Sequence, residues 1–425
     1  MGSASRLNFT RSKTGVERQQ TMQNNQGTIP SLGGEGLVGN RGKDSASDEK
    51  RFAAWLFVAV FASRAFTSSS AYFADANRHV TAALNHSYVI EPPGYWLFNR
   101  TAGLFPDPEI AISVLNWCFS SAGAVLVYLA VRRLASESVA RISSVAYGTV
   151  FWAWHSGNVH STYASQLFFP VAIFLCFLYY WEKPNLGWVL AAAVLFALGS
   201  GFRPSDGAFF APAFLYGLSK AKRSHVMTSL VVICLLCVGW LIPQQLGLWK
   251  QTVPIERNFS SHLVSMADGV LVVGFSRFAL SNAIRVLIPF VMAIFPLLGL
   301  ILGNRKQTFL WIWILPGMAF FLLIYLGQAS YLDYLLAALV ILAVTNPRAS
   351  DRKKVWRLAI CAALNVVFYF AWRPIEFRNP ALQVAEYVLE ADAGKFSYYG
   401  VQHHYEPRLS QLLHLQGYGE PVHKK

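Results

Sequence analysis

The sequence predicts an all-α integral membrane protein, a polytopic bundle of about 11 transmembrane helices. Of the 425 residues, 54% are hydrophobic and only 14% are charged, whereas soluble domains have about 25% charged residues. The apolar residues form long blocks separated by short charged segments, which is typical of helical membrane proteins. The residue-by-residue alternation of a membrane β-barrel is absent from the sequence.

Eleven apolar segments have the composition of membrane spans. They are residues 52–72, 110–131, 142–154, 162–181, 187–201, 207–218, 226–246, 281–303, 308–326, 332–345 and 355–372. The shortest of them are expected to tilt, or to break where they line a cavity. We place them in a transmembrane domain at 51–372, between a disordered cytoplasmic tail at 1–50 and a short extracytoplasmic tail at 373–425.

The distribution of basic residues predicts the orientation of the chain. The net charge is +14, but the Lys and Arg residues lie mostly at the ends of spans, which favours control of topology over nucleic-acid binding. With a cytoplasmic N-terminus, 21 of the 36 Lys and Arg residues fall on the cytoplasmic side and 12 fall outside. The same orientation puts the chemically varied loops outside, so we expect an extracytoplasmic active site.

The first outer loop contains the candidate catalytic residue. Asp75 follows the first span and is a candidate general base, because a partly desolvated cleft can tune the pKa of a carboxylate. The alternative is a carboxylate that caps a helix expected at 76–85. Glu91-Pro-Pro-Gly-Tyr95 then forms a stiff corner. We expect Tyr95 to anchor this corner at the membrane interface and Glu91 to make a secondary polar contact.

The segment that joins the third and fourth spans carries candidate substrate-binding side chains. We expect His155, His160 and Tyr163 to hydrogen-bond to a sugar or phosphate, and the alternative is a solvated loop. Two His residues five apart on a loop are not a convincing metal site, so no metal ligand is assigned.

The Gly199–Asp206 segment places two ionisable residues between apolar runs. The guanidinium of Arg203 suits a phosphate, and Gly199 and Gly201 allow a close approach of the backbone. The alternative is an ion pair between Arg203 and Asp206 that closes a loop.

Three more outer residues complete the predicted substrate site. Lys250 and Arg277 are expected to help Arg203 bind the phosphate. Gln328 lies in a tight turn at 327–331 and is named as a further contact.

In this order and on one side of the membrane, these patterns resemble the GT-C superfamily of polytopic glycosyltransferases. The resemblance covers roughly residues 50–345. It rests on Asp75, Ala82-Ala-Leu84, Pro92-Pro-Gly-Tyr95, Phe151-Trp152 before Tyr163, Gly201-Phe-Arg203-Pro-Ser-Asp206, Trp240-Leu-Ile-Pro243 and Gly327-Gln-Ala-Ser-Tyr331. The Pro-Pro-Gly-Tyr form looks most like the branch of the protein O-mannosyltransferases and lipid A arabinose transferases.

The resemblance implies interfacial helices in the first outer loop and Asp75 as the catalytic base. The sequence departs from the family pattern in three places. Ala76 follows Asp75 where many relatives carry an acidic pair, and Ser161 stands where relatives often have Glu. The outer C-terminal domain of several relatives is reduced to about fifty residues.

The function implied is that of an inverting GT-C glycosyltransferase, a hexosyl- or pentosyltransferase. It would move a sugar from a polyprenyl-phosphate donor to a hydroxyl of a glycan, lipid or protein acceptor at the bilayer, without nucleic acid. A divalent cation, Mg²⁺ or Mn²⁺, stays open as a cofactor. The alternatives are a transporter or flippase for lipid-linked saccharides and an inactive scaffold with the GT-C fold. On the resemblance alone, we expect a bacterial inner membrane.

Overall fold

The computed structural model describes residues 43–68, 74–84, 95–245, 275–304, 307–323 and 329–376. Within these ranges the regular structure is helical and no β-strand occurs. The chain divides into a short unit, Met1–Ala46, and a compact unit, Ser47–Lys425. The second unit contains all the described helices, apart from the first residues of the helix that begins at Lys43.

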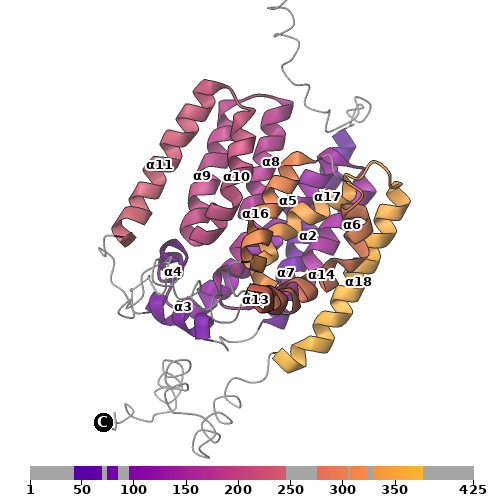
Figure 1. The fold of residues 1–425 in the computed structure, drawn as a ribbon, viewed down its shortest axis with the longest axis horizontal. Helices are drawn as coiled ribbons and strands as arrows, with labels where there is room; N and C mark the ends of the chain where they lie inside the picture. The colour runs from indigo at the N-terminus through magenta and orange to yellow at the C-terminus, as the bar shows by residue number, and fades with distance from the viewer. Residues whose placement is uncertain are drawn as a thin grey trace, which may run out of the picture. The chain divides into compact units, whose positions relative to one another are not determined.

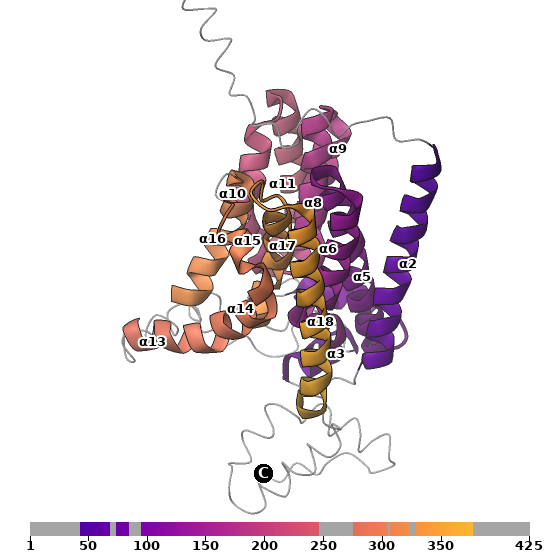
Figure 2. The ribbon, with the colours of Figure 1, turned by 90° about the vertical axis from the view of Figure 1, so that its right-hand side faces the viewer.

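Figures 1 and 2 show the described helices. They are α2 (Lys43–Thr67), α3 (Ala74–Leu84), α4 (Trp96–Ala102), α5 (Pro108–Leu134), α6 (Glu137–Thr149), α7 (Phe151–Asn158), the 3₁₀ turn η1 (Thr162–Leu167), α8 (Phe169–Glu182), α9 (Leu186–Phe202), α10 (Pro204–Ser219), α11 (Arg223–Gln245), α13 (Phe275–Asn282), the π-helical turn η2 (Ala283–Leu287), α14 (Ile288–Ile294), η3 (Phe295–Leu297), α15 (Leu298–Ile301), α16 (Thr308–Leu323), η4 (Ala329–Leu335), α17 (Leu336–Val344) and α18 (Asp351–Glu376).

The all-α membrane architecture is confirmed. Among the described residues, five helices are long and apolar enough to cross a membrane, and three shorter apolar helices accompany them. Each of the eleven predicted spans overlaps described helix. The two short helices in the first outer loop are α3 and α4.

The predicted span at 142–154 is not one helix, because the chain breaks at Val150 between α6 and α7. A new helix start leaves its first N–H groups without partners inside the helix. The Phe151 N–H donates to Asn365 Oδ1 of α18 at 2.8 Å. This bond from another span stabilises the break, and no local sequence signal reveals it.

One end of the bundle is held by charged side chains. Arg132 of α5 pairs with Glu49 of α2 and, at 2.8 Å, with Glu137 of α6. Arg133 pairs with Glu182 at the end of α8. These pairs join four helix ends on the side where the sequence predicts the cytoplasm.

The helices α3 and α4 lie at the other end of the bundle. They pack through a small apolar cluster that includes Ala76, Phe98, Ile112 and Phe202. Ile112 lies near the start of α5 and Arg132 near its end. At a rise of ~1.5 Å per residue, the two residues are about 30 Å apart. Both views show α3 and α13 at the same end (Figures 1 and 2). The predicted working face therefore gathers at this end.

Candidate active site

Arg203 is the centre of the site. It lies between α9 and α10 with extended backbone, and Pro204 begins the next helix. The side chain is buried, with 4% exposed. Its Nε donates to Asp206 Oδ1 at 3.0 Å and its Nη1 donates to Thr162 Oγ1 at 2.8 Å. The predicted ion pair with Asp206 is therefore present, and it crosslinks this break to η1.

Three tyrosine rings surround the Arg203 guanidinium. Its Cζ lies 4.7 Å from the ring centroid of Tyr163, 5.3 Å from that of Tyr331 and 5.9 Å from that of Tyr95. Cations are stabilised over aromatic faces at such distances. We call Arg203, Asp206 and these three tyrosines the arginine cage. It brings together four residues that the sequence analysis named and adds Tyr331.

The guanidinium keeps hydrogen-bonding capacity for a ligand. Arginine has five N–H donors in a fixed plane, and the bonds to Asp206 and Thr162 use two of them. Within the described ranges no acceptor takes the other three. The planar set of N–H donors matches a phosphate or a carboxylate, because two oxygens of either group can accept hydrogen bonds from it at the same time.

Tyr95 reaches the cage through an unusual backbone conformation. It precedes α4 with φ 61° and ψ 28°, the left-handed region, and no other described non-glycine residue has a positive φ. Such strain costs about 1–3 kcal/mol and persists where the surroundings enforce it. With this conformation the Tyr95 ring lies beside the Arg203 guanidinium.

His79 links α3 to the cage, and the sequence analysis missed it. It is buried, its Nδ1 lies 2.7 Å from Asn99 Oδ1 of α4, and its ring lies 5.4 Å from that of Tyr95. Asp75 precedes His79 by four residues, and residues four apart share one face of a helix. The i, i+4 spacing of Asp75 and His79 is the sequence signal that could have identified His79.

Asp75 lies in the first turn of α3, because this helix begins at Ala74. It is the second helical residue and not the residue that caps the helix from outside. Its side chain is outside the described part of the structure. The backbone places it one turn from His79, on the helix that contacts the cage.

Asp333 is a second residue that the sequence analysis missed. It lies in η4, is fully buried, and accepts a hydrogen bond from Ser156. It interacts electrostatically with both Arg203 and Asp206. Asp333 was included in the span predicted at 332–345 and was not considered as a site residue. A lone carboxylate in an apolar run is nevertheless a signal of function.

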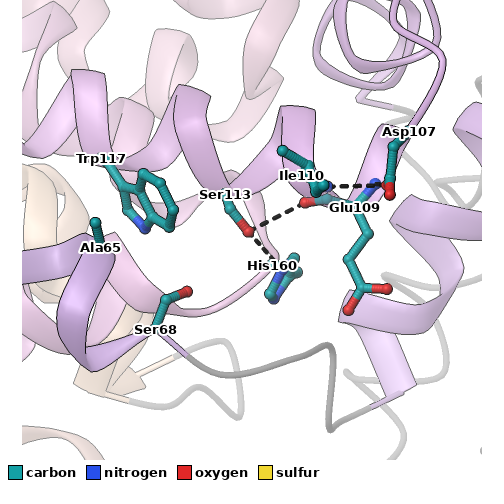
Figure 3. A pocket seen from close by; sticks show the side chains of 8 residues that line it. All are labelled: Ala65, Ser68, Asp107, Glu109, Ile110, Ser113, Trp117 and His160. Carbon is teal, nitrogen blue, oxygen red and sulfur yellow. Dashed lines mark hydrogen bonds between the residues drawn. The ribbon is translucent and has the colours of Figure 1, made fainter.

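An open hollow with a volume of about 310 Å³ lies between the end of α2, the start of α5 and His160 (Figure 3). His160, predicted as a substrate contact, lines it and places Nε2 2.7 Å from Ser113 Oγ. Glu109, in the first turn of α5, lines it as well. The imidazole is buried against α5 and is not part of a solvated loop.

Two other predicted residues, His155 and Arg277, are not part of the cage. His155 packs on Phe151 and Trp152 of its own helix. Arg277 is exposed on α13. Glu91, Lys250 and Gln328 lie outside the described residues. In the ranges that the structure describes, no three His, Cys, Asp or Glu side chains lie close enough together to hold a metal ion.

The glycines of this region have a different role from the one predicted. A Cβ on Gly201 would lie 2.9 Å from Leu97 Cδ2 and 3.2 Å from Trp240 Cε2. A Cβ on Gly199 would lie 2.9 Å from the Phe169 ring. The space beside both glycines is therefore filled by side chains of α4, α11 and α8, and it does not admit a ligand.

Comparisons with known proteins give one matching family model and solved structures of similar fold. Residues 90–243 match the family model described as dolichyl-phosphate-mannose-protein mannosyltransferase. ArnT from Cupriavidus metallidurans bound to undecaprenyl phosphate has a similar fold, with a TM-score of 0.51 and 15% identity over 88% of this chain and 73% of that one. The apo state of the same protein gives a TM-score of 0.51 and 14% identity over 78% of this chain and 65% of that one. No curated protein matches the sequence.

Proposed function

We propose that this chain, which has the polytopic fold of the GT-C glycosyltransferases, transfers a sugar from a polyprenyl-phosphate donor to an acceptor hydroxyl. The observation that carries the proposal is the arginine cage beside the helix that bears Asp75. Four of the five cage residues lie within the segment that matches the mannosyltransferase family model. The protein of similar fold that binds undecaprenyl phosphate supports the same class of donor.

The cage suits the phosphate of the donor. The spare N–H donors of Arg203 would bind the phosphate oxygens, and Asp206 fixes the guanidinium from the other side. Negative charge develops on this phosphate as the sugar leaves, so a preorganised cation there lowers the barrier. The polyprenyl tail stays in the bilayer, which explains why the site is built from the ends of membrane helices.

Asp75 is the proposed base. It accepts the proton of the acceptor hydroxyl while the hydroxyl oxygen attacks the anomeric carbon. The bond between the anomeric carbon and the phosphate oxygen breaks, and polyprenyl phosphate leaves with the electron pair. Attack from the face opposite the leaving group inverts the configuration. We place this face outside the cell membrane of a bacterium, with the N-terminus inside.

Replacing Asp75 tests the proposal. Asp75→Asn keeps the size of the side chain but cannot accept the proton, and a general base typically contributes ~10²–10⁴-fold to the rate. Purified protein in lipid nanodiscs would be incubated with a panel of polyprenyl-phosphate sugars, and release of polyprenyl phosphate would be scored. We expect the variant to bind the donor normally and to release almost none of it.

Two outcomes would contradict the proposal. Near-normal transfer by Asp75→Asn would remove Asp75 from the chemistry. Movement of intact lipid-linked sugar across the bilayer by both wild type and variant, without release of polyprenyl phosphate, would identify a transporter instead.

A further inference from the structure

The hollow is built from three parts of the chain. The end of α2 contributes Ala65 and Ser68, the start of α5 contributes most of the remaining lining, and His160 comes from the segment before η1. We propose that this hollow binds one sugar ring of a saccharide acceptor. The inference rests on the proposed function, because it names the substrate that the donor sugar is transferred to.

The lining has the chemistry of a carbohydrate site. It offers carboxylates, hydroxyls, an imidazole and an indole, from Asp107, Glu109, Ser68, Ser113, His160 and Trp117. Carboxylates and hydroxyls accept hydrogen bonds from sugar hydroxyls. An indole adds a flat apolar surface. Figure 3 shows His160 between Ser68 and Glu109 at the mouth of the hollow.

The polar groups of the lining are held in place. Ser113 Oγ contacts Glu109 O at 3.1 Å and His160 Nε2 at 2.7 Å. A hydroxyl has one hydrogen, so both bonds form when His160 Nε2–H donates to Ser113 and Ser113 donates to the carbonyl. Asp107 caps α5 by accepting from Glu109 N at 2.9 Å. The imidazole, hydroxyl and cap therefore form one preorganised wall.

Trp117 lines the hollow, but its indole N–H is not open to it. The Trp117 Nε1 atom is buried and has no acceptor among the described side chains and backbone. A buried donor without a partner costs about 1–3 kcal/mol. Because the Nε1 atom is buried, the Trp117 indole would meet a sugar ring with its apolar face and not with its N–H.

The hollow and the arginine cage are neighbours along one short segment. Asn116 of α5 holds this segment by donating to Val159 O at 2.6 Å and to Ser161 O at 3.0 Å. His160 lines the hollow, and Thr162 accepts from Arg203. Two residues of extended chain span at most ~7 Å. The backbone positions of His160 and Thr162 are therefore at most ~7 Å apart, and we place the acceptor ring on the same side of the bundle as the donor phosphate.

The size of the hollow favours a sugar over a polypeptide. Its volume of about 310 Å³ is at the lower end of the ~300–1,000 Å³ of small-molecule sites. Peptides in extended form are commonly bound by adding a strand to a sheet edge, and the lining belongs to helices and a short connection. We therefore choose a saccharide acceptor over a protein acceptor.

Saturation-transfer NMR on the protein in lipid nanodiscs tests the inference. The probes are N-acetylglucosamine, glucose and a Ser/Thr-containing hexapeptide. The variants are Ser113→Ala and Trp117→Leu. The control is Ser121→Ala, because Ser121 makes the same kind of i, i−4 bond, to Trp117 O at 2.6 Å, but does not line the hollow. Binding of undecaprenyl phosphate, measured on every sample, reports both correct folding and the donor site.

We expect at least one saccharide to bind wild type and Ser121→Ala equally, and to bind Ser113→Ala about three- to ten-fold more weakly, as loss of one hydrogen bond predicts. Trp117→Leu should abolish the signal while donor binding persists. The inference is overturned if no saccharide binds a protein that binds the donor, if the pocket variants bind saccharide as wild type does, or if the hexapeptide binds instead. Loss of donor binding by wild type would instead contradict the proposed function.

Discussion

Arg203 shows how two interpretations of one residue are compatible. The sequence offered a phosphate ligand or an ion pair with Asp206, and the structure contains the pair together with unused donors on the same guanidinium. A buried charge needs a partner. The ion pair with Asp206 therefore stabilises the buried Arg203 guanidinium when no anionic ligand is bound.

Changing Arg203 to lysine tests the role of the planar fork. Lysine keeps the charge but loses the fixed fork of donors, so Arg203→Lys should remain folded and bind the donor about ten-fold more weakly. Titration of the purified variant with undecaprenyl phosphate measures this. Arg141→Lys is the matched control, because Arg141 forms an i, i+4 pair with Glu137 at 2.8 Å at the other end of the bundle. Equal affinities for both variants and wild type would exclude phosphate recognition by Arg203.

We expect His79 to act as a positioning residue whose role is separable from donor binding. His79→Ala removes the contact with Asn99 Oδ1 at 2.7 Å and loosens the helix that carries Asp75. We expect kcat to fall by about ten-fold or more while the dissociation constant of the donor stays unchanged, since small misplacements of a catalytic group are costly. His79→Asn places a donor near the position of Nδ1 and should recover part of kcat. A purely structural role would lower stability and donor affinity in parallel.

At the scale of elements, the site depends on breaks in helices. The break at Val150 turns the chain from α6 into α7, and the break at Arg203 turns it from α9 into α10. Each break exposes N–H groups that another element must satisfy. Asn365 does so at the first break and also donates to Ala293 O at 2.7 Å. It therefore connects α18, α14 and the start of α7.

Removing the Asn365 side chain tests this dependence. Asn365→Ala leaves the Phe151 N–H and the Ala293 carbonyl without this partner, and a buried polar group that loses its partner costs about 1–3 kcal/mol. We expect a clear fall in the midpoint of thermal unfolding, measured in detergent by intrinsic fluorescence. Lys353→Ala, at an exposed position of the same helix, should leave the midpoint within error. Unchanged unfolding of Asn365→Ala would show that the break is stable without it.

At the scale of the whole molecule, the two ends of the bundle differ in chemistry. One end is held by Arg–Glu pairs among α2, α5, α6 and α8, and the other holds the cage and the hollow. The positive-inside rule assigns the first end to the cytoplasm.

Single cysteines in a cysteine-free background test the orientation. Leu104 is 67% exposed at the site end, and Ser219 is exposed at the end of α10. Leu104→Cys should react with a membrane-impermeant thiol reagent in intact cells, and Ser219→Cys should react only after the cells are opened. Ser156 and Ser330, although outer residues by sequence, are buried and unsuitable as reporters. Labelling of Ser219→Cys in intact cells would invert the topology.

The membrane class, the approximate positions of the apolar segments and the polar breaks that carry cage residues can be inferred from the sequence alone, whereas the break at Val150 cannot. These properties are local: hydropathy over ~20 residues defines a span, and an ionisable residue between apolar runs marks a site. Arg203 and Asp206 were predicted in this way, and Tyr95, Tyr163 and His160 were predicted from the polar segments between spans.

Which of these residues lie close together depends on the tertiary structure. Arg277 and His155 share the predicted face but lie apart from the cage, because packing between α9, η1, η4 and α4 selects its members. Tyr331 joins the cage from more than 120 residues beyond Arg203. His79 is outside the cage and packs against its Tyr95. Side chains meet through helix packing that hydropathy does not encode, so the sequence locates the working end of this protein, and the fold assembles its site.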